Sequence, residues 1–258
     1  MLLYIICLVV LGLPAMTMEF SVGRAAQASP IRMYQKLEKP GCKWGIFGIA
    51  SLIGNIALMA FYTVVTGWII YYFIKFLTGQ NADFGFTQMI TNPTVNVVFL
   101  LVTVVVAFAI LSFNLQGGLE RITKYMMLAL LVLMLVLAVH SLPLPGAAEG
   151  LKFYLVPDFA AMAEIGIGNV IFGALSQAFF TLSIGAGSMT IFGSYLGKDR
   201  SLLGESLHIT ILDTFVALMA GLIIIPACFA FGVEPGAGPG LVFITSVSYT
   251  HLRAHETV

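Results

Sequence analysis

The stretch Gln177-Ala-Phe-Phe-Thr-Leu-Ser-Ile-Gly-Ala-Gly-Ser188 lies in the middle of a long apolar segment but is poorly suited to remain a helix. Each glycine inside a helix costs about 1 kcal/mol relative to alanine. Two glycines with serines on both sides therefore make local unwinding inexpensive. Close packing against another helix through small residues is the alternative, and Gly193 and Gly197 fit it well. These residues alone support the two interpretations about equally.

An unwound stretch inside a membrane exposes backbone N–H and C=O groups that lipid cannot satisfy. A bound ion, a polar substrate or a water-filled cavity can satisfy them instead. The two new helix ends also carry partial charges of opposite sign. In transporters with discontinuous helices, such ends bind the substrate carboxylate and the coupling ion. The stretch 181–188 is therefore a candidate binding site.

The composition places the chain in a membrane. It has 258 residues, of which 59% are hydrophobic and 9% are charged. Soluble domains carry roughly 25% charged residues, and a soluble chain this apolar would expose aggregation-prone patches. The net charge of zero excludes a basic footprint for nucleic acid. The three scattered cysteines form neither a disulfide framework nor a metal-binding pattern.

Six apolar stretches are long enough to cross about 30 Å of hydrocarbon as helices. The predicted architecture is therefore an all-α membrane protein with six transmembrane helices. The fifth of them, 168–196, contains the glycine-rich break and is predicted to be discontinuous. The six predicted spans cover residues 1–22, 45–74, 93–115, 124–142, 168–196 and 206–232.

The positive charges predict the orientation. Nine of the twelve Lys and Arg residues fall in alternate loops, 23–44, 116–124 and 197–205. The positive-inside rule places these loops in the cytoplasm. The localisation predicted is the cytoplasmic (inner) membrane, with residue 1 and the segment after Val233 outside.

Asp213 lies well inside the sixth apolar run. An aspartate at the centre of a membrane helix costs about 2.5–3.5 kcal/mol, so it normally has a partner in a polar interior. The spans offer no lysine or arginine at matching depth, which favours a transported cation, sodium or a proton. A neutral aspartate bonded to Thr210 or Thr214 is the alternative.

Three other polar residues in the spans are interpreted structurally. Tyr62 is expected to pack, although its hydroxyl is able to bind a carboxylate. Asn55 is expected to make a hydrogen bond between helices. Glu19, near the inner end of the first span, is expected to pair with backbone or basic groups.

Four segments together resemble the neurotransmitter:sodium symporter family in its bacterial amino-acid branch. The 177–188 stretch is the most specific of them. The other three are Gly12-Leu-Pro-x4-Glu19-Phe-x2-Gly23-Arg24, Tyr62-x5-Trp68 and Gly117-Gly-Leu-Glu-Arg-Ile-Thr-Lys-Tyr125. The resemblance implies that residues 1–245 are helices two to seven of an inverted-repeat sodium symporter fold, without its first helix and everything from the eighth onward. The tail 246–258 is abruptly polar and is excluded as non-native.

The resemblance also implies roles for individual residues. Phe180 would cover an amino-acid substrate, Thr181 would ligate sodium, and Ser183 would contact the substrate. Tyr62 would bond the substrate carboxylate and Leu58 would line the pocket, while Ala186 stands where many relatives carry a larger residue. Asp213 falls where relatives carry a sodium-ligating Asn, and its charge would replace the chloride that some relatives need. Two further residues, Tyr4 and Gln177, match the neighbourhood of that anion.

The predicted function is sodium-coupled symport of a neutral amino acid by the parent protein, with sodium as the coupling ion. An inactive membrane fragment and a proton-coupled transporter are the alternatives. An enzyme is not predicted, because the sequence has no nucleophile–base pair and no HExxH motif. A channel would need a filter loop or rings of polar residues, and neither is evident. The amino acid and the oligomeric state are not indicated.

Overall fold

The structure is a computed structural model that describes residues 1–79, 86–112 and 120–232. The described residues form helices and contain no strand. The helices are α1 (Leu2–Cys7), the π-helix η1 (Leu8–Gly12), α2 (Leu13–Ala26), α3 (Pro30–Leu37), α4 (Gly45–Leu77), α5 (Phe86–Thr91), α6 (Pro93–Ser112), α7 (Glu120–Ser141), α8 (Ala147–Leu155), α9 (Phe159–Ile165), α10 (Ile167–Thr181), α11 (Ser188–Tyr195) and α12 (Leu202–Phe231).

Five helical stretches are long and apolar enough to cross a membrane, which confirms five of the predicted spans to within a few residues. They are Leu2–Ala26, Gly45–Leu77, Pro93–Ser112, Thr123–Ser141 and Leu202–Ala230. Part of the predicted loop 116–124 and all of the tail 246–258 lie outside the described residues.

The remaining predicted span, 168–196, is discontinuous, as the sequence predicts. Helix α10 ends at Thr181 and α11 begins at Ser188, so residues 182–187 separate two helical halves, and this segment is called the break below. At about 1.5 Å per residue, the two helices together supply roughly 34 Å, enough to cross the hydrocarbon. Helix α9 meets α10 at a bend of 98°, so α9 does not prolong the same crossing.

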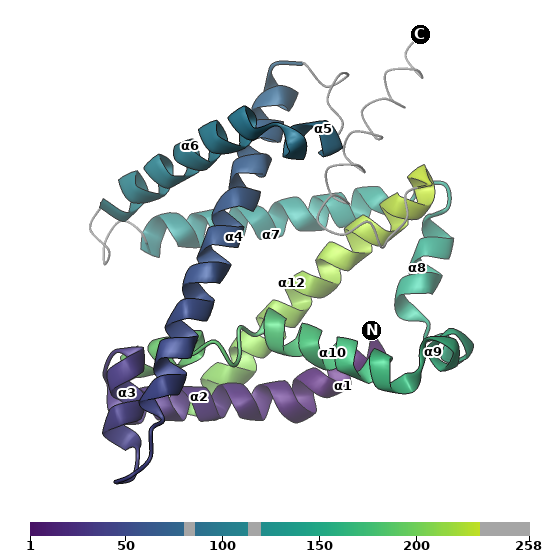
Figure 1. The fold of residues 1–258 in the computed structure, drawn as a ribbon. Coiled ribbons are helices and arrows are strands. Elements are labelled where there is room, and N and C mark those ends of the chain that lie inside the picture. The colour runs from purple at the N-terminus through teal and green to yellow at the C-terminus, as the bar shows by residue number, and fades with distance from the viewer. Residues whose placement is uncertain (80–85, 113–119, 233–258) are drawn as a thin grey trace. The chain divides into compact units, whose positions relative to one another are not determined.

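Contacts divide the chain into two compact units, which share α4 and α12. Unit 1 comprises Met1–Leu58 and Leu155–Leu218, and unit 2 comprises Met59–Tyr154 and Met219–Val258. Both halves of the broken span belong to unit 1. There α10 packs along α1, and α11 packs along α2 (Figure 1). Each half of the broken span therefore packs against one half of the first span.

The first span has its own irregularity, which the sequence does not indicate. The π-helix η1 interrupts it at Leu8–Gly12. A side chain added at Gly12 would meet the buried Leu182, the first residue of the break, at 2.8 Å. Short π-helical turns inside α-helices often mark functional sites. Here η1 and the start of the break face each other across the core of unit 1.

Helices α2 and α11 approach so closely that their backbones touch. A Cβ on Gly193 would lie 2.6 Å from the carbonyl oxygen of Phe20, and one on Gly23 would overlap the carbonyl oxygen of Thr190. Membrane helices pack mainly through van der Waals contact, which small residues allow at short range. The packing alternative that the sequence raised for Gly193 is therefore correct at that residue, while the break itself is unwound.

Replacing Gly193 by Leu is expected to lower stability by about 1–3 kcal/mol, because the new side chain must push α2 and α11 apart. The measurement is the thermal unfolding midpoint of the purified protein. Gly173→Ala is the matched control, since a Cβ on Gly173 of α10 has open space around it. An equal loss in both variants would contradict the close contact.

Unit 2 contains an aromatic cluster around the C-terminal half of α4. The buried residues are Tyr71, Tyr72 and Met89, with Trp68 and Phe99 packed against them. The indole N–H of Trp68 donates to Asn96 Oδ1 at 2.7 Å. Asn96 in turn donates to the carbonyl oxygens of Met89, Ile90 and Asn92, which joins α5 to α6.

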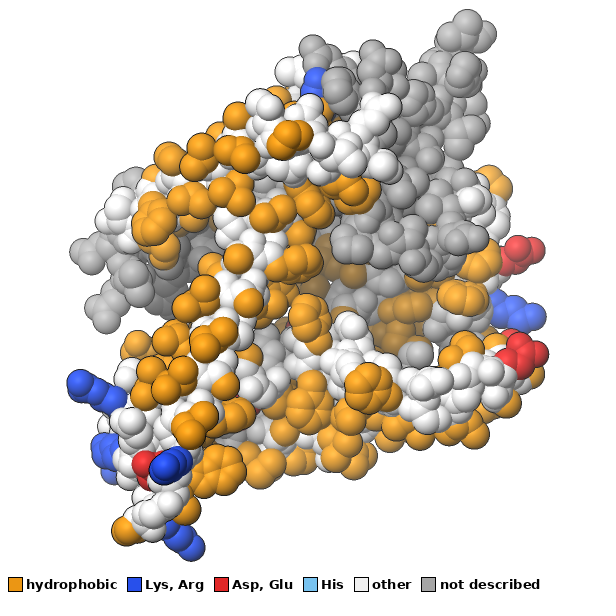
Figure 2. Space-filling model, viewed as in Figure 1, with side chains coloured by type: hydrophobic (Ala, Val, Ile, Leu, Met, Phe, Trp, Pro, Cys, Tyr) orange, Lys and Arg blue, Asp and Glu red, His pale blue; other side chains and the backbone are white. Residues whose placement is uncertain are grey.

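The surface is typical of a membrane protein. Large hydrophobic side chains are exposed along most of the helices, and Figure 2 shows them covering the visible faces of α4 and α6. Lys and Arg side chains gather at the end that carries α3, where the predicted loop 23–44 holds five of them (Figure 2). The chain is therefore a multi-pass membrane protein, and its orientation remains a prediction.

Candidate functional site

The break leaves a run of backbone oxygens free. The N–H groups of Leu182, Ser183 and Ile184 return to carbonyl groups in the last turn of α10. The five carbonyl oxygens of residues 181–185, all within the described part of the chain, accept no hydrogen bond there. Ser183 has a φ of +53°, which is unusual for a residue with a side chain, and strain of this kind clusters at functional sites. The break therefore presents polar backbone inside an apolar protein.

A group of side-chain oxygens lies beside the end of α10. The hydroxyl of Tyr4 lies near those of Thr181 and Thr214 and near the carboxylate of Asp213, yet it has hydrogen-bond geometry with none of them. Asp213 Oδ2 and Thr214 Oγ1 are also buried without a partner. Gln177 Nε2 donates to Thr181 Oγ1 at 3.2 Å. The cluster therefore contains several oxygens without a hydrogen-bond partner, and such oxygens are suited to bind a cation.

The alternative that Asp213 is bonded to neighbouring threonines does not agree with this geometry. Within the described residues, Asp213 makes no hydrogen bond and no ion pair, and the hydroxyls of Thr210 and Thr214 are also buried without partners. Unpaired buried carboxylates are costly, because burial removes water that stabilises their charge. A cation in the cluster would remove that cost.

Glu19 holds the other side of the break. Its carboxylate accepts a hydrogen bond from the N–H of Gly185 at 2.6 Å, and the N–H of Thr190 lies near it. Thr190 is in the first turn of α11, where N–H groups lack partners within the helix. Glu19 from α2 thus places a negative group at the positive end of α11. The interpretation of Glu19 as a partner of backbone groups is confirmed.

Tyr34 connects this side of the break to α3, which lies outside the spans. Its hydroxyl lies close to Thr190 and to Glu19. The pKa of Tyr34 is raised, chiefly by burial and then by the negative charge of Glu19. The protonated phenol is therefore the form at neutral pH, and it can donate toward the polar groups beneath the break.

Replacing Glu19 by Ala is expected to lower the thermal midpoint by about 5 °C, because hydrogen bonds to charged groups contribute about 1.5–3 kcal/mol. Glu19→Gln keeps an acceptor for Gly185 and should recover part of that loss. Glu164→Ala, at an exposed position of α9, is the control and should leave the midpoint unchanged. A wild-type midpoint for Glu19→Ala would show that the contact does not stabilise the break.

Not all of the predicted site residues meet in one place. Tyr4, Gln177, Thr181 and Asp213 form the oxygen-rich cluster. Ser183 and Ala186 lie within the break, and Phe180, the residue expected to cover the substrate, is 58% exposed at the end of α10. Leu58 is the last residue of α4 in unit 1, whereas Tyr62 belongs to unit 2.

The sequence does not indicate the role of two residues at the site, Thr214 and Asn55. Thr214 was considered only as a partner for Asp213, whereas its hydroxyl lies near that of Tyr4. The hydrogen bond predicted between Asn55 and another helix is confirmed in kind, but the sequence does not indicate that its partner is the break. The hydroxyl next to an intramembrane aspartate is the one signal that pointed to Thr214.

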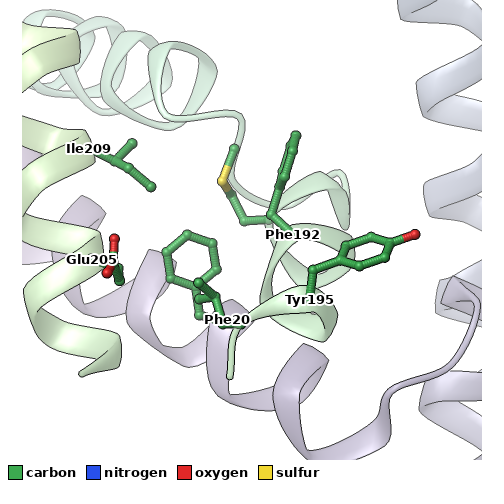
Figure 3. A pocket seen from close by; sticks show the side chains of 7 residues that line it. Phe20, Phe192, Tyr195, Glu205 and Ile209 are labelled. Carbon is green, nitrogen blue, oxygen red and sulfur yellow. The ribbon is translucent and has the colours of Figure 1, made fainter. Parts of the chain in front are cut away.

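A separate hollow of about 350 Å³ lies between α2, α11 and α12 (Figure 3). In Figure 3, Phe20 stands between Ile209 and Glu205 of α12 and Phe192 and Tyr195 of α11. The hollow has an apolar lining with one carboxylate and shares no residue with the oxygen-rich cluster. No cluster of His, Cys, Asp or Glu suited to a transition metal occurs among the residues that the structure describes.

The chain matches the sequence model of the "Sodium:neurotransmitter symporter family" over residues 1–94 and 80–246. It is 35% identical to an uncharacterized sodium-dependent transporter, YhdH, of Bacillus subtilis, over 94% of this chain and 54% of the relative. It is 32% identical to an uncharacterized sodium-dependent transporter of Haemophilus influenzae, over 98% of this chain and 58% of the relative. The chain therefore spans about half the length of the curated relatives it matches.

A solved structure shares the fold. MhsT in complex with L-phenylalanine matches with a TM-score of 0.85 and 36% sequence identity. The match covers 95% of this chain and 57% of that one. The fold of this chain is thus seen in a crystal structure of a related chain.

Proposed function

Because the chain belongs to the sodium:neurotransmitter symporter family, we propose that its full-length protein carries a neutral amino acid across the cytoplasmic membrane together with sodium. The family is one of transporters and not of enzymes. The sodium-dependent relatives support sodium as the coupling ion. Residues 1–245 would be the second to seventh helices of the transporter, with the tail 246–258 outside the functional domain.

The observation that carries the proposal is the cluster of unpartnered oxygens at the end of α10. Asp213, Thr214 and Tyr4 each bring a buried oxygen that lacks a partner in the described residues, and Thr181 adds a hydroxyl. Hard cations are bound by carboxylate, carbonyl and hydroxyl oxygens, and discontinuous helices supply carbonyl groups for sodium in transporters. We assign Asp213 and Thr181 as sodium ligands, with Tyr4 and Gln177 beside them.

The substrate is assigned by chemistry and by similarity. MhsT is solved with L-phenylalanine, which supports a neutral amino acid for this chain. The substrate would lie against the break, with Phe180, Ser183 and Ala186 on one side. The resemblance to the family assigns Leu58 to the lining of the substrate pocket and Tyr62 to a hydrogen bond with the substrate carboxylate. Ala186 has a small side chain, which leaves room for a larger substrate side chain.

Sodium binding and substrate binding would be coupled through the break. Its free carbonyl groups, those of residues 181–185, lie between the cation cluster and the proposed substrate pocket in the chain. A sodium ion that orders these carbonyl groups prepares the pocket, so each ligand raises the affinity for the other. Access would alternate as one group of helices rocks against the rest.

The proposal is tested with the full-length protein reconstituted in liposomes. Uptake of labelled L-phenylalanine and of a set of other neutral amino acids is measured with an inward sodium gradient, with equal sodium on both sides, and with a proton gradient alone. We expect accumulation only with the sodium gradient. Uptake indifferent to sodium would refute the symport proposal, and accumulation driven by protons alone would favour a proton-coupled transporter with Asp213 as the proton carrier.

A further inference from the structure

Asn55 of α4 makes three hydrogen bonds, and two of them hold the turn at Gly187, where the break ends. Its Nδ2 donates to the carbonyl oxygen of Ala186 at 2.6 Å and to that of Ser51 at 2.8 Å. Its Oδ1 accepts from the hydroxyl of Ser188 at 2.9 Å. Ala186 and Ser188 lie on either side of Gly187, where the backbone turns left-handed before α11 begins. One side chain therefore ties α4 to both sides of this turn.

The hydrogen bonds fix the orientation of the Asn55 amide. Two carbonyl oxygens face its nitrogen, and a hydroxyl that can donate faces its oxygen. The flipped amide would point its oxygen at two acceptors, so the network permits one orientation. Both N–H groups are then used, and Asn55 has no donor left for a substrate.

The surroundings show how closely this contact is built. A Cβ on Gly187 would lie 3.2 Å from both the Cβ and the Oγ of Ser51, one turn before Asn55. Gly187 is buried, and its carbonyl oxygen accepts from the Thr190 hydroxyl and from the N–H of Ile191. The carbonyl groups of Ala186 and Gly187 are therefore both occupied, in contrast to the free ones of residues 181–185.

We propose that Asn55 is a positioning residue, which occupies the Ala186 carbonyl and thereby restricts the break to the conformation whose free carbonyl groups are those of residues 181–185. The statement that this conformation binds ligands rests on the proposed function. The statement that Asn55 determines the conformation of the break does not depend on that function. Asn55 acts through the break and does not itself touch the ion or the substrate.

The proposal predicts a particular pattern of affinities. Without Asn55, a smaller fraction of the molecules has the binding-competent conformation of the break. The apparent affinity for sodium falls in proportion to that fraction. Sodium at saturation restores the population, because it binds the competent conformation preferentially. Loss of a direct ligand would instead raise the sodium midpoint and leave the exchange of the break in the absence of sodium unchanged.

The experiment is amide hydrogen exchange of the full-length protein in detergent, with sodium alone as the probe and choline as its replacement. In the absence of sodium, Asn55→Ala is expected to speed exchange of the amides of residues 185–188 by about tenfold, the size expected from losing two buried hydrogen bonds. The sodium concentration that half-protects these amides should rise about tenfold, with full protection at saturation. Ser188→Ala, which removes one bond, should give about threefold.

Asn96→Ala is the matched control, since Asn96 is also a membrane-helix amide bonded to backbone carbonyl groups, but in unit 2. It should leave both the exchange of residues 185–188 and the sodium midpoint at wild-type values. Wild-type exchange in Asn55→Ala, or a change of equal size in Asn96→Ala, would overturn the proposal. If Asn55→Ala does not fold, Ser188→Ala decides, and a wild-type rate there overturns it.

The outcome also separates this inference from the proposed function. If sodium fails to protect the break in the wild type, sodium coupling is refuted. The comparison of exchange rates without sodium then still determines whether Asn55 holds the break.

Discussion

Replacing Asp213 by Asn in the full-length protein is expected to make sodium-driven amino-acid uptake depend on chloride. The carboxylate is the one acidic group in the oxygen-rich cluster, which otherwise consists of hydroxyl groups and the Gln177 amide. Removing one partner of a buried charge pair costs about 3–5 kcal/mol. That is a loss of at least about 100-fold in sodium affinity when chloride is absent, and a chloride ion near Tyr4 and Gln177 would restore the missing charge.

The measurement is the sodium half-saturation of uptake, with chloride or gluconate as the anion. Asp199→Asn is the control, because Asp199 is an exposed carboxylate that lies outside the oxygen-rich cluster and 3.9 Å from the neighbouring Arg200. It should be indifferent to the anion. If Asp213→Asn keeps its sodium affinity in gluconate, Asp213 has no role in the sodium site.

Replacing Gly187 by Val is expected to reduce uptake by at least about 100-fold per transporter molecule, the effect of about 3 kcal/mol lost at the binding site. Gly187 has a φ of +74°, a region that β-branched residues rarely adopt. Its added side chain would also press on Ser51 at 3.2 Å. The break must then move away from α4, which displaces the carbonyl groups of residues 181–185.

A series of variants separates strain from contact. Gly185→Val introduces the same strained backbone at a φ of +89° but meets open space, so its effect should be smaller. Gly168→Val in α10 has open space as well and no positive φ, and it serves as the control. Uptake is normalised to the amount of protein in the membrane. Equal uptake by Gly187→Val and Gly168→Val would show that the turn at Gly187 is not needed.

Glu19 and Asn55 each have a simple structural explanation when they are considered separately. Glu19 at the start of α11 is a helix cap, and Asn55 is a bond between helices. Together they hold the break from two sides, through Gly185 and through Ala186 and Ser188. The break is therefore a fixed piece of irregular backbone, which is what a preformed ion site requires.

The sequence by itself determined the class of protein, five continuous spans and the place of the break. These depend on local properties, since apolar length defines a membrane helix and clustered glycines and serines make unwinding inexpensive. It also singled out Asp213, because an isolated charge in an apolar run needs a partner wherever it points. Each of these features depends on residues that are close together in the sequence, so it can be predicted without the tertiary structure.

Only the tertiary structure decided which groups meet the break. Glu19 reaches Gly185 across 166 residues, and Asn55 reaches Ala186 across 131. Helices such as α4 are apolar on nearly all sides, so their sequence carries no amphipathic pattern that shows which face turns inward. Lipid is as apolar as the helix surfaces, and the pairing of faces is therefore set by shape and hydrogen bonds that exist only once the helices are packed.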